Sequence, residues 1–129
     1  MKTIDVLIVV DALGSLAGKL QDNVYLVDTN KHIGSGHEGQ AELRTACSDG
    51  QLIRWRVEPI SPSNDVTISR FTGKMVEQKV CTPKREGSPD DEYWEGRVET
   101  QGSVGNYQYS VVLSIDGREQ SFDPFLVVT

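Results

Sequence analysis

Apolar and polar residues alternate along short segments of this chain from one end to the other. The clearest run has apolar side chains at every second position from Tyr107 to Ile115, with Gln108, Ser110 and Ser114 between them. A period of two residues places successive side chains on opposite faces of a strand, so that one face is buried and the other is hydrated. The pattern therefore predicts β-strands.

Nine segments fit this strand pattern, and each is bounded by Gly, Pro, Asn, Asp or Ser. They span about residues 3–11, 23–29, 40–47, 51–58, 65–71, 92–100, 107–115, 118–122 and 125–129. A short helical turn is expected within 12–20, and residues 74–80 fit either a helical turn or an edge strand. The polar run 84–92 is expected to be a mobile surface loop.

The number of strands predicts a single all-β domain over residues 1–129, folded as an antiparallel β-sandwich. The long joins between strands favour a jelly-roll-like arrangement, with an immunoglobulin-like sandwich as the alternative. A chain of 129 residues buries about two thirds of its unfolded surface and needs neither a disulfide nor a metal to hold its core.

The first of two Asp-Gly pairs, Asp49-Gly50, predicts a hairpin with a defined register. A three-residue loop with a left-handed glycine sets Leu43 opposite Trp55, so that the apolar faces of the two strands agree. The same register sets Glu42 opposite Arg56 as an exposed ion pair.

The second pair, Asp116-Gly117, predicts a two-residue type I′ turn. This turn places Gln120 opposite Leu113, on the core face of the hairpin. A glutamine there requires either an edge position or a polar partner.

The chain is acidic, with 19 acidic and 13 basic residues and a net charge of −6. Without a basic patch, this charge excludes nucleic acid and anionic membranes as expected partners. The N-terminal apolar run superficially looks like a signal peptide, but Asp5 and Asp11 confine it to 6–10, which is too short. Nothing approaches the length of a transmembrane helix, so we expect a cytoplasmic protein. Cys47 and Cys81 are expected to be free thiols, with a single bridge as the alternative.

One loop holds candidate metal ligands: His32, His37 and Glu38, with Asp28 preceding them. Two imidazoles and a carboxylate suit zinc or another transition metal. The spacing fits no standard motif, however, and the glycines around it favour a solvated connection between strands. We therefore expect no cofactor.

A second candidate is a glycan- or small-molecule-binding site around Tyr93 and Trp94, with the carboxylates of 90–91 beside them. Tyr107 with Asn106 is the alternative location. The competing interpretation is that Trp94 and Trp55 are core residues, because each alternates in phase with apolar neighbours. No serine lies in a nucleophile elbow and neither cysteine lies in an activating context. The sequence therefore predicts no catalytic residue and no enzyme.

Several segments together resemble one family. They are IDVLIVVDA (4–12), GSGHEGQAELRTACSDGQLIRWRV (34–57), FTGKMVEQKVC (71–81), YWEGRVE (93–99) and YSVVLSIDGREQSFDPFLVV (109–128). In this order they are similar to the AidA/PixA-type inclusion-body proteins of Gram-negative bacteria.

The resemblance implies a β-sandwich without known enzyme activity. It also implies a cytoplasmic bacterial protein that accumulates and self-associates, in some members under cell-density control and in association with a host. Members that gave the family its name are rich in methionine, whereas this chain has only Met1 and Met75, which argues against sulfur storage. For self-association we expect strand edges as contacts, with Phe125–Val128 and Val66–Phe71 as candidates.

Overall fold

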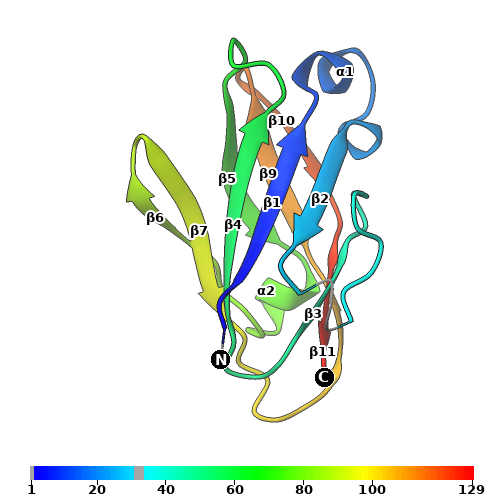
Figure 1. Ribbon diagram of the computed structural model, residues 1–129, viewed down its shortest axis with the longest axis vertical. Coiled ribbons are helices and arrows are strands. Elements are labelled where there is room, and N and C mark those ends of the chain that lie inside the picture. The colour runs from blue at the N-terminus through cyan, green and yellow to red at the C-terminus, as the bar shows by residue number, and fades with distance from the viewer. Residues whose placement is uncertain (1, 31–33) are drawn as a thin grey trace.

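The computed structural model describes residues 2–30 and 34–129 and confirms the all-β sandwich (Figure 1). One layer is a five-stranded sheet with the strand order β2 (Val24–Asp28), β1 (Ile4–Val10), β4 (Leu52–Pro59), β7 (Asp91–Arg97) and β6 (Lys84–Ser88). The other layer contains two three-stranded sheets, β10 (Arg118–Phe122), β9 (Ser110–Ile115), β5 (Val66–Thr72) and β3 (Arg44–Cys47), β11 (Phe125–Val128), β8 (Gly105–Gln108). The described chain also has the short helices α1 (Ala12–Ala17), η1 (Leu20–Asp22) and α2 (Lys74–Glu77).

Two strand pairs among the described residues are parallel. β1 runs parallel to β4, and β11 runs parallel to β3, whereas the other pairs are antiparallel. The prediction of antiparallel sheets is therefore wrong for these two pairs. Alternation of apolar and polar residues reports which face of a strand is buried, but it contains no information on the direction of the strand. In β1 the even-numbered side chains from Ile4 to Val10 are all buried, as the pattern predicted.

The last four strands form one long hairpin with an unbroken register. Leu113 lies opposite Gln120 in the β9–β10 pair, and Tyr107 lies opposite Leu126 in the β8–β11 pair. Between them the Tyr109 N–H donates to the carbonyl oxygen of Pro124 at 3.0 Å, in the same register. The two three-stranded sheets are therefore joined along this hairpin into one layer.

The turn at Asp116-Gly117 confirms the predicted two-residue hairpin. Both residues have positive φ, 48° and 87°, as a type I′ turn requires. Gln120 has the polar partners that its position demands, because its side chain accepts from the Leu20 N–H and donates to the Ser15 carbonyl, each at 3.0 Å.

The hairpin predicted at Asp49-Gly50 is wrong. Gly50 does have a positive φ of 88°, but β3 pairs with β11 and β4 pairs with β1 and β7, so the chain changes layers at this turn. Both strands still direct their apolar side chains into one core, which is why matching faces suggested a ladder. Arg56 accordingly lies near Asp5 and Asp91 instead of Glu42.

The run 84–92, expected to be a loop, forms most of the β6–β7 hairpin. Its residues are almost all exposed, so no apolar alternation marks it. Cross-strand contacts hold it instead: Arg85 pairs with Glu92 at 3.0 Å and lies 5.3 Å from the ring centre of Trp94. Residues 74–77 form the helical alternative, α2, and 12–17 form the expected helix, α1.

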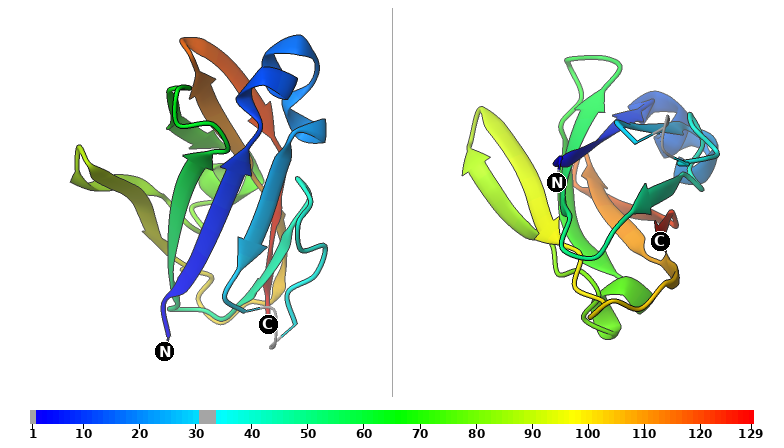
Figure 2. Two further views of the ribbon diagram at one scale, coloured as in Figure 1. Left: turned by 45° about the horizontal axis from the view of Figure 1, so that its top comes forward. Right: turned by 60° about the horizontal axis from the view of Figure 1, so that its bottom comes forward.

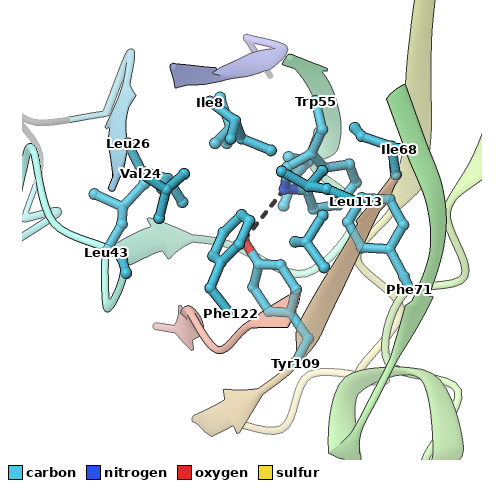
Figure 3. Close-up of a cluster of buried hydrophobic side chains, with 14 of the residues drawn as sticks. Ile8, Val24, Leu26, Leu43, Trp55, Ile68, Phe71, Tyr109, Leu113 and Phe122 are labelled. Atoms are coloured by element: carbon cyan, nitrogen blue, oxygen red, sulfur yellow. Dashed lines mark hydrogen bonds between the residues drawn. The ribbon is translucent and has the colours of Figure 1, made fainter. Parts of the chain in front are cut away.

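The core lies between the two layers (Figure 3). Its aromatic centre is a cluster of Trp55, Phe71 and Tyr109, with ring centres 4.9 to 6.1 Å apart. Cys47 and Cys81 are buried free thiols, as expected. Within the described ranges, no helix combines the length and apolar character that crossing a lipid bilayer requires.

Candidate functional site

A groove opens where the β6–β7 hairpin leaves the body of the sandwich. β7 pairs with β4 over Leu52–Trp55, and beyond Trp55 the hairpin diverges from β4 (Figures 1 and 2). The space between them has a volume of about 250 Å³. We call it the hairpin groove. It is lined by Arg56, Val57 and Glu58 of β4, residues 65–68 at the start of β5, and residues 89–92 and Trp94 of the hairpin.

The two aromatic residues of the predicted ligand-binding site, Tyr93 and Trp94, lie on opposite faces of β7. Trp94 lines the groove, where its ring packs 5.4 Å from that of Phe71 and beneath Arg85. Tyr93 points to the opposite face of β7, because neighbouring side chains alternate. There the guanidinium groups of Arg54 and Arg56 lie 5.3 and 4.9 Å from the centre of its ring. Arginine side chains therefore cover both rings, and neither is a bare platform for stacking a sugar.

The Trp94 indole N–H is buried and has no hydrogen-bond partner among the described residues. The carboxylates predicted to accompany it, Asp90 and Asp91, do line the same groove. The structure thus brings Trp94, Asp90 and Asp91 to one groove, whose lining includes neither Tyr93 nor the alternative pair Tyr107 and Asn106.

Acidic side chains dominate the charge of the hairpin groove. They are Glu58, Asp65, Asp90, Asp91 and Glu92. The cation of the lining, Arg56, lies between Asp91 at 3.6 Å and Asp5 at 3.8 Å, so its charge is already shared. The groove is therefore suited to positively charged groups and unsuited to phosphates or nucleic acid.

The predicted metal ligands are only partly placed. His32 lies outside the described residues. His37 is exposed, and the Glu38 side chain accepts a hydrogen bond from the backbone N–H of Asp28 at 3.1 Å. The Asp28 carboxylate accepts from the Asn30 N–H and from the Thr45 hydroxyl, at 2.8 and 2.7 Å. In the parts of the chain that the structure covers, no three His, Cys, Asp or Glu side chains are grouped to hold a metal ion.

Of the two segments predicted as edge contacts, one lies inside a sheet and the other lies at an edge. Phe125–Val128 is not an edge, because β11 lies between β3 and β8. β5 is indeed the last strand of its sheet. At the edge strand β2, the Gly39 N–H donates to the Leu26 carbonyl at 2.5 Å, so a neighbouring loop covers part of this edge.

Sequence reasoning missed an apolar patch on the outer face of the five-stranded sheet. Leu7, Tyr25 and Val27, from β1 and β2, are 37%, 47% and 44% exposed. Leu7 and Val27 are direct cross-strand partners. We call these three residues the β1–β2 face. The signal was present in the uninterrupted apolar run of 6–10, since a strand that is apolar at successive positions has two apolar faces.

Four of the charges beside the β1–β2 face, and Asp91 of the hairpin, are paired with one another. Arg54 and Glu95 form an ion pair of 2.8 Å, and Arg56 lies between Asp5 and Asp91. A shallow hollow of about 460 Å³ lies at their boundary, lined in part by Leu7, Val27 and Arg56.

A protein-family model for a domain of unknown function, DUF8788, matches residues 2–121. The chain belongs to the DUF8788 family. No curated protein matches it. Among solved structures, the crystal structure of an inclusion body protein, PixA, from Burkholderia cenocepacia J2315 is similar, with a TM-score of 0.74 and 11% sequence identity. The match covers 99% of this DUF8788 chain and 95% of that chain. At this identity the likeness confirms a shared fold, and the predicted PixA-type resemblance is confirmed at that level.

Proposed function

We propose that this DUF8788 protein is a non-enzymatic, cytoplasmic bacterial protein of the inclusion-body type that associates with copies of itself. The observation that carries the proposal is the exposed β1–β2 face, Leu7, Tyr25 and Val27. The fold shared with the PixA inclusion body protein supports the same general kind of function. Cell-density regulation and host association, which the family resemblance implies, belong to the same proposal.

The β1–β2 face is a favourable contact for two acidic chains. Burying a side chain that is about half exposed contributes roughly 1 kcal/mol, and a two-fold axis buries each of the three residues twice. Each chain carries a net charge of −6, so like-charge repulsion opposes association at most surfaces. Beside this face Arg54 pairs with Glu95, and Arg56 lies between Asp5 and Asp91, which lowers that repulsion.

A two-fold dimer closes on itself, so growth into an inclusion needs a second contact. Leu13 and Ile60 are the next candidates, because they are apolar, lie outside the β1–β2 face, and are 71% and 60% exposed. We propose that assembly beyond the dimer uses these residues.

Size-exclusion chromatography with light scattering, over a wide range of protein concentration, tests the proposal. We expect a dimer or larger species whose fraction rises with concentration. Val27→Lys should shift the protein to monomer, because the interface would then bury an unpaired charge. Val104→Lys is the matched control, since Val104 is 72% exposed and lies outside the face.

A strict monomer at every concentration would contradict self-association as a whole. Association that survives Val27→Lys in a folded variant would leave self-association standing and exclude the β1–β2 face as its contact. Circular dichroism and the melting temperature establish whether each variant is folded.

A further inference from the structure

The hairpin groove exposes unpaired strand backbone on its β4 side. The pairing of β4 with β7 ends at Trp55 of β4, which lies opposite Trp94 of β7. In the same register the Val98 N–H donates to the Gln51 carbonyl, at 2.9 Å. Alternate residues of a strand direct their N–H and C=O groups to the same side, so Val57, six residues after Gln51, directs its groups toward the diverged β7. Val57 has no pairing with β7 in the described chain.

The opposite side of the groove is formed by the edge strand β5. The Asp65 carbonyl accepts from the Asp116 N–H on the β9 side, at 2.8 Å. By the same alternation, Val66 and Ile68 direct their backbone groups away from β9. The Ile68 carbonyl is indeed reached from the groove side by Arg85, at 3.4 Å. The Ile68 carbonyl is thus occupied, whereas Val57 of β4 and Val66 of β5 present free backbone to one groove, as edges that accept an added strand do.

The charge of the groove selects the kind of strand. Its lining has five carboxylates and one arginine. Asp91 already pairs with Arg56, and Glu92 with Arg85 from the hairpin. The excess negative charge therefore comes from Glu58, Asp65 and Asp90, for which the described residues show no ion pair. Lysine or arginine side chains on an added strand would meet this charge favourably. A second copy of this chain is a poor occupant, because its own projecting hairpin tip carries Asp90 and Asp91.

We propose that the hairpin groove binds an extended, basic segment of a partner protein by strand addition. The segment hydrogen-bonds through its backbone to Val57 and to the edge of β5 at Val66. Its Lys or Arg side chains, at alternate positions, lie against the acidic lining. This site uses none of the residues of the β1–β2 face, so it stands or falls independently of self-association.

The test uses the full chain and a synthetic peptide, acetyl-Lys-Val-Lys-Val-Lys-Val-amide, in isothermal titration calorimetry at low salt. We expect binding of one peptide per chain and a change in tryptophan fluorescence, because Trp94 lines the groove. Methylating alternate backbone nitrogens of the peptide should weaken binding about tenfold or more, because each methyl removes a backbone donor. Replacing the lysines by glutamates should abolish binding.

Asp90→Lys should weaken peptide binding about fivefold or more, through like-charge repulsion. Glu77→Lys is the matched control and should change binding by less than about twofold, because Glu77 is exposed on α2, outside the groove lining. Absence of peptide binding overturns the proposal. Binding that is insensitive to N-methylation overturns it as well, since that is general attraction to an acidic protein. Equal weakening by both substitutions overturns the assignment to this groove.

Discussion

The indole N–H of Trp55 donates a hydrogen bond to the hydroxyl oxygen of Tyr109, at 3.2 Å, in the centre of the core (Figure 3). Trp55 belongs to β4 in one layer, and Tyr109 lies between β8 and β9 in the other. Both side chains are fully buried. This bond therefore links the two layers and satisfies the polar atom of the largest core side chain. Burial raises the pKa of Tyr109 above its ordinary value, so the hydroxyl remains protonated at neutral pH.

Removing the hydroxyl should destabilise the fold. Tyr109→Phe leaves the Trp55 N–H buried without a partner, which costs about 1–3 kcal/mol. Urea unfolding followed by tryptophan fluorescence measures the loss. Tyr25→Phe is the control, because Tyr25 is 47% exposed, and it should change the free energy of unfolding by less than about 0.5 kcal/mol. Equal stability of the Tyr109→Phe variant and the natural protein would show that the hydrogen bond contributes nothing net.

Gln120 ties β10 to the segment that follows β1. Its side chain accepts from the Leu20 N–H and donates to the Ser15 carbonyl. Gln120→Ala removes both bonds, and we expect the free energy of unfolding to fall by about 1–3 kcal/mol. Hydrogen exchange should accelerate at the Leu20 amide more than in the centre of β1.

Ser121→Ala is the neighbouring control for Gln120→Ala. Ser121 is exposed and should tolerate the change with little loss of stability. Uniform acceleration of exchange throughout the chain would contradict a local role for Gln120, because it would report global destabilisation alone.

The contrast between the two Asp-Gly turns shows what the sequence could predict. At Asp116-Gly117 the partners are neighbours in the chain, so turn chemistry and alternation determine both conformation and register. At Asp49-Gly50 the turn conformation followed from the glycine, but the pairing depended on β1, β7 and β11, which are distant in sequence. A local sequence pattern does not determine which of several distant strands becomes the partner of a given strand.

The candidate site could be predicted only in part, because it too depends on how strands distant in sequence are arranged. The aromatic-acidic segment around Trp94 was visible in the sequence, but the groove beside it arises from the divergence of β7 from β4. The β6 strand is exposed on both faces and so lacks a hydrophobic period. Leu7 and Val27 could have been recognised from their apolar neighbours on both sides, although their exposure depends on which face of the sheet the core covers.

Gly96 is required by the close approach of Cys81. A Cβ atom built on Gly96 would lie 2.6 Å from the Cys81 sulfur and 3.3 Å from backbone atoms of Pro83. We expect Gly96→Ala to cost about 1–3 kcal/mol, as overpacking of a close-packed core does. Thermal unfolding of the Gly96→Ala variant, and of the double variant with Cys81→Ala described next, measures this cost.

Shortening the opposing side chain should relieve the clash at Gly96. In the Cys81→Ala background, Gly96→Ala should cost less than it does in the natural protein, which a double-mutant cycle expresses as a favourable coupling energy. Additive effects of the two substitutions would contradict this contact as the cause. Gly36→Ala is the control, since a Cβ atom there meets nothing within 4 Å.

Alkaline pH should destabilise the fold through the two buried thiols. Burial raises the pKa of Cys47 and of Cys81 from the ordinary 9.0 to about 12. Their contribution is fully present below pH 9. Between about pH 9 and 12 the unfolded chain has released thiol protons that the folded chain still holds, so stability falls as pH rises. At pH 10 the loss is roughly 1.4 kcal/mol for each thiol.

Urea unfolding at pH 7 and pH 10 measures this loss in the natural protein and in the Cys47→Ala/Cys81→Ala variant. The variant lacks both thiols but retains Tyr109 and every other group that titrates in this range. Cavities left by the substitutions lower its stability at both pH values, so they cancel from the comparison. We expect the natural protein to lose about 3 kcal/mol more than the variant. The same loss in both proteins would mean that the thiols ionise as readily in the fold as in the unfolded chain.

Modification by a thiol reagent at pH 8 should accordingly be slow until urea unfolds the protein, because a buried, protonated thiol is a poor nucleophile.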